Sequence, residues 1–349
     1  MLRMPGVREA LDALLNRRLP KMPMFAPDLA ERLNLCRRYG DFSLAYSTAA
    51  QPDLRYFGDA AGYIAFDTKM GHTFVLGDPV CHPASKAAYI SRFLEASGTA
   101  CFVQISRETA AILAAHGYKV NQMGVDTRLP FETHTFAGKR NESVRYSEKW
   151  LMKHGYQILE CDGTVAGAEY IKHISKSWRS GRIVSRREMR FLNRPFSLKL
   201  SMDMRRFVLL EPTGVPAAVL DFDPVFTDGA VVGYTAAFKR KVAGTTSHAE
   251  IGMTKFAVDR FREEGKSHIT LGLSPLAAIA SSGFTESRIW RMFFEFAFRS
   301  KRVNQNIFNL QGQAAFKRRF HGDEIPAYIA FKRGTPMEMV ALLRLLKTL

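Results

Sequence analysis

The sequence predicts an α+β protein made of two successive units, each a mixed, mostly antiparallel sheet flanked by helices. Short apolar runs of strand length follow one another through 55–80 and again through 205–238, with glycine turns between them. Each series is followed by a helix and a further strand, which is the order of a β-α-β unit closing an antiparallel meander. No residue-level repeat relates the two halves.

Length and composition fit two ordinary globular domains. The chain has 349 residues, of which 46% are hydrophobic and 24% charged, and domains commonly hold ~150–200 residues. We predict an N-terminal domain with two leading helices over 1–137, a bridging helix over 138–154 and a C-terminal catalytic domain over 155–349.

The charge is unusual, with 50 Lys and Arg against 33 Asp and Glu, a net charge of +17. Such an excess favours nucleic acid, an anionic membrane or a phosphorylated small molecule as partner, although a basic surface that only aids solubility is an alternative.

The four cysteines have no C-x-x-C spacing, so we expect reduced thiols and no metal site. Charges run through the N-terminal helix and no apolar run reaches 18 residues, so we predict no signal peptide or membrane span and a cytoplasmic location, with the inner membrane surface as an alternative.

In the first half, helices are expected before and between short strands. The predicted helices are 7–19, 26–39, 85–97 and 107–117, and the predicted strands are RYFG, GYIAFDT, HTFVLGDPV, TACFVQI and YKVNQMGVDTRL. A charged helix over 136–154, with Val144, Trp150 and Leu151 buried, should bridge the halves.

In the second half the same order returns. The predicted strands are YQILE, RRFVLLE, PAAVLDFDP, AVVGYTAAF, HITLGL, a short one in NIFNLQ and 327–331, and the predicted helices are 165–178, 248–264, 288–298, one carrying Lys317, and 336–349. Phe293, Phe294, Phe296 and Phe298 are expected in the core. The last helix should cover the sheet of the second unit, with an anionic membrane as the alternative.

The stretch 231–275 is the best candidate for a binding site. An apolar strand enters the basic loop KRKVAGTTS, and Thr246 or Ser247 is the expected N-cap of the next helix. Because a helix N-terminus presents unpaired N–H groups and a positive dipole end, such a loop binds anions. Lys241, Gly244 and Thr245 are the predicted phosphate-binding residues, although a basic connection that faces solvent is an alternative.

A second basic stretch, 172–206, holds eleven Lys and Arg against two acidic residues, a net charge of +9, with Trp178, Phe191 and Phe196 between them. Cations neutralise phosphates and aromatic rings stack on bases, so this stretch is the best candidate for contact with RNA. The alternative is that the aromatic residues belong to the core and the arginines to a solvated face. The predicted tRNA contacts are Arg179, Arg182, Arg186, Arg187, Arg190 and Arg194.

Several motifs together resemble the catalytic C-terminal domain of bacterial phosphatidylglycerol lysyltransferases and their soluble relatives. They include LGDPV at 76–80, Ile174-Ser-x-x-Trp178, Leu271-Gly-x-Ser-Pro-Leu276, and Asn309-Leu-Gln-Gly312 followed by Phe316-Lys317-x-x-Phe320. These motifs span residues 50–332 in one consistent order. The resemblance implies two tandem GNAT-like acyltransferase domains that move an aminoacyl group from charged tRNA to an acceptor.

Residue roles follow from charge, position and this resemblance. Lys317, Arg318 and Arg240 are the predicted catalytic residues, and Tyr234, Thr235, Lys239, Glu250 and Ser274 are the predicted substrate-binding residues. The lysyltransferases have an acid-x-x-Arg pattern on the strand before the glycine loop, and this sequence lacks the acid, which makes lysine doubtful as the transferred residue. Glu250 is the nearest carboxylate able to replace it.

The predicted function is therefore aminoacyl transfer from charged tRNA to a hydroxyl or amine of a lipid or small molecule. Charged tRNA would be the co-substrate, and no other cofactor is expected. An ester donor needs no covalent enzyme intermediate, only a positioned acceptor and stabilisation of the oxyanion. One alternative is an acyl-CoA-dependent N-acyltransferase, and another is a non-catalytic RNA-binding or membrane-binding protein of the same fold.

Overall fold

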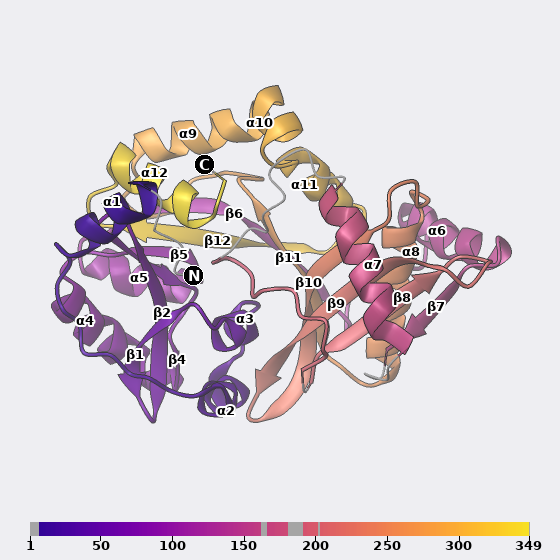
Figure 1. The fold of residues 1–349 in the computed structure, drawn as a ribbon, viewed down its shortest axis with the longest axis horizontal. Helices are drawn as coiled ribbons and strands as arrows, with labels where there is room; N and C mark the ends of the chain where they lie inside the picture. The colour runs from indigo at the N-terminus through magenta and orange to yellow at the C-terminus, as the bar shows by residue number, and fades with distance from the viewer. Residues whose placement is uncertain (1–6, 162–165, 181–190, 202, 349) are drawn as a thin grey trace.

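The computed structural model describes residues 7–161, 166–180, 191–201 and 203–348, and these form one continuous mixed sheet covered by helices (Figure 1). The strands of the first half are β1 (Arg55–Asp59), β2 (Gly62–Lys69), β3 (His72–Leu76), β4 (Val80–Cys81), β5 (Cys101–Ile105) and β6 (Lys119–Pro130). Those that follow are β7 (Gln157–Glu160), β8 (Arg205–Leu210), β9 (Pro216–Thr227), β10 (Ala230–Lys241), β11 (His268–Pro275) and β12 (Asp323–Phe331).

The helices of the first half are α1 (Val7–Asn16), α2 (Leu29–Tyr39), α3 (Ala45–Ala50), α4 (Lys86–Ser97), α5 (Arg107–Ala115) and α6 (Glu142–Lys153). Those of the second half are α7 (Ala166–Ser180), α8 (Ala249–Glu263), α9 (Arg288–Arg299), α10 (Lys301–Asn306), α11 (Leu310–Arg318) and α12 (Pro336–Leu345). Most predicted elements are confirmed. The predicted strand in NIFNLQ is wrong, because Ser300 caps α10 and Asn309 caps α11, and these caps hold the stretch in helical turns.

Within the described residues the strand order is β1-β2-β3-β5-β12-β6-β11-β10-β9-β8-β7, with β4 beside β2. All neighbours are antiparallel except two pairs, β3 with β5 and β10 with β11. The chain between the strands of each parallel pair contains a helix, α4 in the first and α8 in the second. The predicted α+β class and the recurring order are therefore confirmed, while the domain boundaries at 137 and 155 stay a prediction.

The C-terminal part of the chain lies in the first half of the molecule. Strand β12 pairs with both β5 and β6, so the last strand is inside the sheet of the first half. Helix α12 follows β12 after a turn at Gly334, whose φ is +65°. Its Met339 and Leu342 pack in one cluster with Tyr63 and Leu76. The expectation that this helix covers the sheet of the second unit is wrong, because the turn after β12 is too short to reach it.

Side chains of the first half alternate between two cores, as period-two strands require. Tyr63 and Ala65 of β2 pack with α12, whereas Ile64 and Phe66 pack with Phe93 of α4. Such burial on both faces keeps this half rigid, so that it can form one wall of a cavity between the halves.

Candidate active site

A cavity of about 200 Å³ lies where the parallel pairing of β10 and β11 ends. The two strands pair only from Gly233 to Thr235 on β10, and each has an irregularity just beyond, at 236–238 and 270–273. Residues of both irregular stretches line the cavity. A gap between two splayed parallel strands leaves backbone groups without strand partners, and it therefore suits a polar acyl ligand.

The cavity lies between the two halves of the chain. Ser43, Ser47 and Gln104 of the first half line one side, and β9, β10, β11 and α11 line the other. Because these segments are far apart in the sequence, the site is complete only when both halves are packed together.

Lys317 of α11 presents a buried amine in the wall of this cavity. Its Nζ donates to the carbonyl oxygens of Gly272, at 2.7 Å, and Leu273, at 2.6 Å. Gly272 has φ +76°, and a Cβ there would lie 3.4 Å from the Ala236 carbonyl oxygen, so glycine lets the strand turn its carbonyls toward the amine. Burial lowers the pKa of Lys317 to about 7, against the opposing effect of the Asp126 carboxylate. A neutral amine that donates two hydrogen bonds keeps its lone pair for a third partner.

Three basic residues of β10, Lys239, Arg240 and Lys241, follow one another at the end of the strand. Lys239 and Arg240 line the cavity, and burial lowers the pKa of Lys239. The Arg240 guanidinium lies 3.7 Å from the ring centroid of Phe196 and 4.7 Å from that of Trp178. The two aromatic side chains thus pack on a guanidinium, while the third predicted aromatic, Phe191, is buried in the core of the first half. Lys241 lies at the end of β10, outside the cavity wall.

Glu250, in the first turn of α8, faces two of these cations. Its carboxylate lies 3.9 Å from Lys239 Nζ and 3.6 Å from Lys241 Nζ. It does not line the cavity, so the structure gives it the role of holding the two lysines rather than the predicted contact with substrate. A carboxylate here also places negative charge next to the predicted phosphate loop.

The glycine loop has the predicted backbone and a later helix start. Gly244 has φ +86° with open space where a Cβ would point, so the turn requires glycine. The Thr245 hydroxyl donates within the loop, to the carbonyl oxygen of Val242 at 2.8 Å. The N-cap is His248, not Thr246 or Ser247, because the Thr246 hydroxyl accepts from the His248 N–H and adds a further turn before α8.

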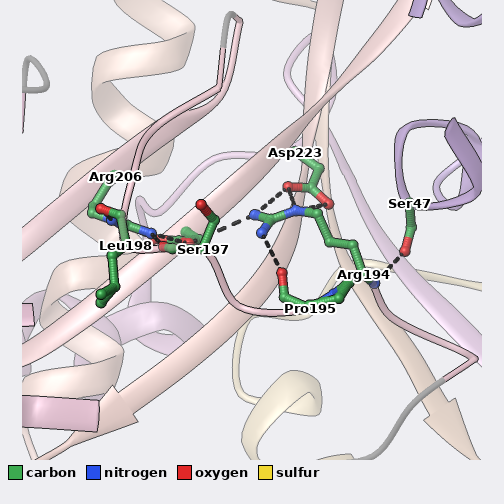
Figure 2. Close-up of polar contacts among 8 residues, drawn as sticks. Ser47, Arg194, Pro195, Ser197, Leu198, Arg206 and Asp223 are labelled. Carbon is green, nitrogen blue, oxygen red and sulfur yellow. Dashed lines mark hydrogen bonds and ion pairs between the residues drawn. The ribbon is translucent and has the colours of Figure 1, made fainter. Parts of the chain in front are cut away.

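Four buried charges support the wall of the cavity (Figure 2). Arg206 donates to both oxygens of Asp221, at 2.6 and 2.7 Å, and Arg194 donates to Asp223 at 2.8 Å. Arg194 Nη2 also lies 3.6 Å from Asp221. All four residues are at most 4% exposed, and their formal charges cancel. Ring faces of Phe196 and Phe238 cover the guanidinium groups of Arg206 and Arg194. These four charges are hereafter the buried ion cluster.

The buried ion cluster corrects the role predicted for Arg194. Its side chain is bound to Asp223, and its backbone N–H donates to Ser47 Oγ of the first half at 2.7 Å (Figure 2). A buried, paired guanidinium is not available to the phosphates of a tRNA. Arg194 therefore joins the two halves. Arg182, Arg186, Arg187 and Arg190 lie outside the described residues, and the side chain of Arg179 is likewise not described.

Of the other predicted residues, only Thr235 reaches the cavity. Tyr234 points into the core on the α8 side, where its ring stacks on Phe261 at 4.3 Å, because neighbouring residues of a strand face opposite ways. Ser274 is buried on β11 and is not part of the lining. Arg318 is 53% exposed and donates to Glu324 at 3.0 Å, so it lies apart from Lys317 although the two are adjacent in sequence.

Replacing Arg318 with alanine is expected to change kcat/KM by no more than about twofold, because exposed ion pairs contribute little. Steady-state kinetics of the Arg318→Ala variant, with thermal unfolding as the control for folding, would measure this. A loss comparable with that of a Lys317 variant would return Arg318 to the active site.

Two carboxylates that line the cavities were not predicted from the sequence. Asp223 is the acidic residue that lines the cavity within the described residues, and it lies opposite Thr235 on the neighbouring strand. Asp223 on β9 thus provides the acid that is absent from β10. In the sequence, the only indication of it was the spacing of two residues between Asp221 and Asp223, which places both side chains on the same face of a strand. Asp126 of β6 lies near Lys317, and burial raises the pKa of its carboxyl group against the effect of that lysine.

Asp126 faces a second cavity, of about 170 Å³, that shares Ser43 and Gln104 with the first. Asp41, Asp78 and Arg128 also line it. Lys317 therefore stands between a cationic cavity and a more acidic one. Within the part of the chain that the structure describes, no cluster of His, Cys, Asp or Glu is arranged to hold a metal ion.

A sheet with a splayed parallel pair and a glycine loop before the following helix is the arrangement of acyltransferases of the GNAT-like class. The chain belongs to the family described as phosphatidylglycerol lysyltransferase, C-terminal, whose model matches residues 33–331. The predicted resemblance is confirmed. No significant match is found among curated protein sequences.

Solved structures agree on the fold. L-PGS from Bacillus licheniformis has a TM-score of 0.77 and 18% identity, over 94% of this chain and 99% of that one. FemX has a TM-score of 0.54 and 10% identity, over 91% and 99% of the respective chains. In the described residues, no helix has the length and apolar character needed to cross a bilayer.

Proposed function

We propose that this protein transfers a small, neutral aminoacyl group from a charged tRNA to an amine or hydroxyl acceptor. The observation that carries the proposal is the position of Lys317, an amine whose pKa is lowered to about 7, in a cavity that also presents Asp223 and the cations of β10. No cysteine or histidine is among the described residues of the cavity wall, which suits direct transfer from an ester. Family membership and the FemX-like fold support the same reaction class.

In the proposed reaction, the acceptor nitrogen or oxygen attacks the carbonyl carbon of the ester while neutral Lys317 takes the acceptor's proton. The bond between the carbonyl carbon and the ribose oxygen then breaks, and protonated Lys317 returns the proton to that oxygen. Lys239 and Arg240 stabilise the negative charge that develops on the carbonyl oxygen or on the terminal phosphate. Asp223 accepts hydrogen bonds from the α-ammonium of the aminoacyl group.

The described lining of the cavity sets the expected donor. Ala236, Ala237 and Leu271 are small or apolar, and the Asp223 carboxylate is shared with Arg194, which leaves no second carboxylate for a side-chain ammonium. A lysyl side chain would be buried beside cations without a partner. Alanyl- or seryl-tRNA should therefore be used with a kcat/KM at least about a hundredfold above that of lysyl-tRNA.

The proposed transfer and the preference for a small, neutral aminoacyl group can be tested together, with tRNAs that are charged separately with each radioactive amino acid. The protein is incubated with each charged tRNA and hydroxylamine as acceptor, and the label that leaves the tRNA faster than in the Lys317→Met control identifies the donor. If no charged tRNA loses label faster than in this control, the proposed reaction is wrong. If lysyl-tRNA is the best donor, the assignment of a neutral aminoacyl group is wrong.

Acyl transfer from acyl-CoA is the second candidate, favoured by the open turn at Gly244 before α8. Against it, Glu250 places a carboxylate beside Lys239 and Lys241, where the CoA pyrophosphate would approach the loop. Saturable acetyl-CoA binding that is insensitive to RNase, with acetyl transfer to hydroxylamine, would favour the CoA reaction over the tRNA reaction.

A further inference from the structure

Helix α9 presents apolar side chains on both of its long faces. Trp290, Phe294 and Ala297 are buried in or against the first half, and Trp290 Nε1 donates to the Gly334 carbonyl oxygen at 3.0 Å. On the opposite side, Ile289, Met292 and Phe296 are 61%, 70% and 69% exposed. Their spacing of three and four residues places them in one row along the helix. These three residues are hereafter the α9 stripe, and α9 runs along one edge of the molecule (Figure 1).

One member of the α9 stripe, Phe296, was not expected to face solvent. Phe296 was predicted in the core with its phenylalanine neighbours, and that prediction is wrong because the inner face of α9 is already filled by Trp290 and Phe294. An exposed row of large apolar side chains on a firmly packed helix is typical of an interaction surface.

Cations lie beside the α9 stripe. Residues 288–302 contain five Lys and Arg against one carboxylate, a net charge of +4. Arg291 pairs with Glu286 and Glu295. The remaining four, Arg288, Arg299, Lys301 and Arg302, are exposed. On the helix, Arg288 and Arg299 project on the flank of the stripe away from the buried face.

We propose that the α9 stripe and its cations form a docking surface for an anionic lipid bilayer. Apolar side chains of an amphipathic helix enter the boundary between headgroups and acyl chains, while flanking Arg and Lys meet anionic headgroups. A second copy of this chain fits less well, because two stripes packed together would bring their like-charged flanks into contact. A nucleic acid would use the cations and leave the stripe exposed to water. The proposal concerns where the protein resides and does not depend on its donor.

Vesicle flotation with the full chain, without tRNA or acceptor, tests this surface. The vesicles contain phosphatidylcholine alone or phosphatidylcholine mixed with phosphatidylserine, so that capture of a particular acceptor lipid in the cavity plays no part. The protein should bind the anionic vesicles and not the neutral ones, and added salt should weaken binding. The triple variant Ile289→Ser, Met292→Ser, Phe296→Ser should lower the partition coefficient by about tenfold or more. Arg299→Gln and Arg302→Gln should each lower it about fivefold.

The matched control is the variant Met152→Ser, Leu159→Ser, which removes two other exposed apolar side chains, 58% and 48% exposed, and should leave binding unchanged. Transfer to water-soluble hydroxylamine should be the same in the triple variant and the wild type, so loss of docking is separable from loss of catalysis. The proposal would be overturned if the wild-type protein did not bind anionic vesicles, or if the triple variant bound them as well as the wild type. So would sedimentation showing a wild-type dimer that the triple variant dissociates.

Discussion

The Lys317→Met variant is expected to lose about 10²–10⁴-fold in kcat, because methionine keeps the volume of the side chain but cannot accept a proton. Lys317→Arg should fail equally, since a guanidinium stays protonated at every pH of interest. The nearby carbonyls of Gly272 and Leu273 lose a donor in the methionine variant, so thermal unfolding must accompany the kinetics. The Arg318→Ala variant, one residue along α11, is the control for local disturbance.

The pH dependence of the wild type separates two roles of this amine. A base must be neutral to act, so kcat/KM should fall about tenfold per pH unit below the pKa of about 7 and reach a plateau above it. If Lys317 acted only as a cation, the rate would instead fall as pH rises through the same value. A rate that falls above neutrality, together with an active Lys317→Arg variant, would contradict the proposed proton transfer.

Asp221→Asn is expected to lower the free energy of unfolding by about 3–5 kcal/mol, because Arg206 would remain buried with no charged partner. Arg206 reaches only Asp221 and the carbonyl oxygens of Ser197 and Leu198 within the described residues. Urea unfolding of the purified variant measures the change. Asp228→Asn, in the exposed turn after the same strand, is the matched control, because asparagine also accepts the φ of +49° found there.

A double replacement shows whether charge is the cause. Asp221→Leu combined with Arg206→Leu removes both charges and should recover part of the stability lost in Asp221→Asn. Full stability of the single Asp221→Asn variant would mean that water reaches Arg206, and the cluster would then not support the cavity wall.

Local pattern predicted most strands and helices, because alternation and capping act over a few residues. The strands around Ile64 and Phe102 were predicted in place, as was the glycine turn at Gly244. The cavity between the halves could not be predicted in this way. Ser43, Gln104 and Asp223 meet only through tertiary packing, and no spacing in the sequence records which strand ends will face each other.

Charge on its own was misleading at Arg194. The sequence shows a guanidinium in a basic stretch, which favours a nucleic-acid contact, but it does not show that Asp223 on a distant strand will neutralise it. Lys317 differs, because its motif predicted a site residue and the structure places this side chain in the cavity wall. Its catalytic role stays a prediction, and its carbonyl partners could be known only from the structure.

The position of β12 has a consequence for how this protein is made. Ribosomes deliver the chain from its amino end, yet β5 and β6 share a neighbour that emerges only with residues 323–331. Until then both strands expose a ladder edge, which is where nascent proteins aggregate. The pairing of β5 and β6 is therefore completed only after residues 323–331 have been synthesised, and a chain cut before β12 would leave the sheet of the first half open.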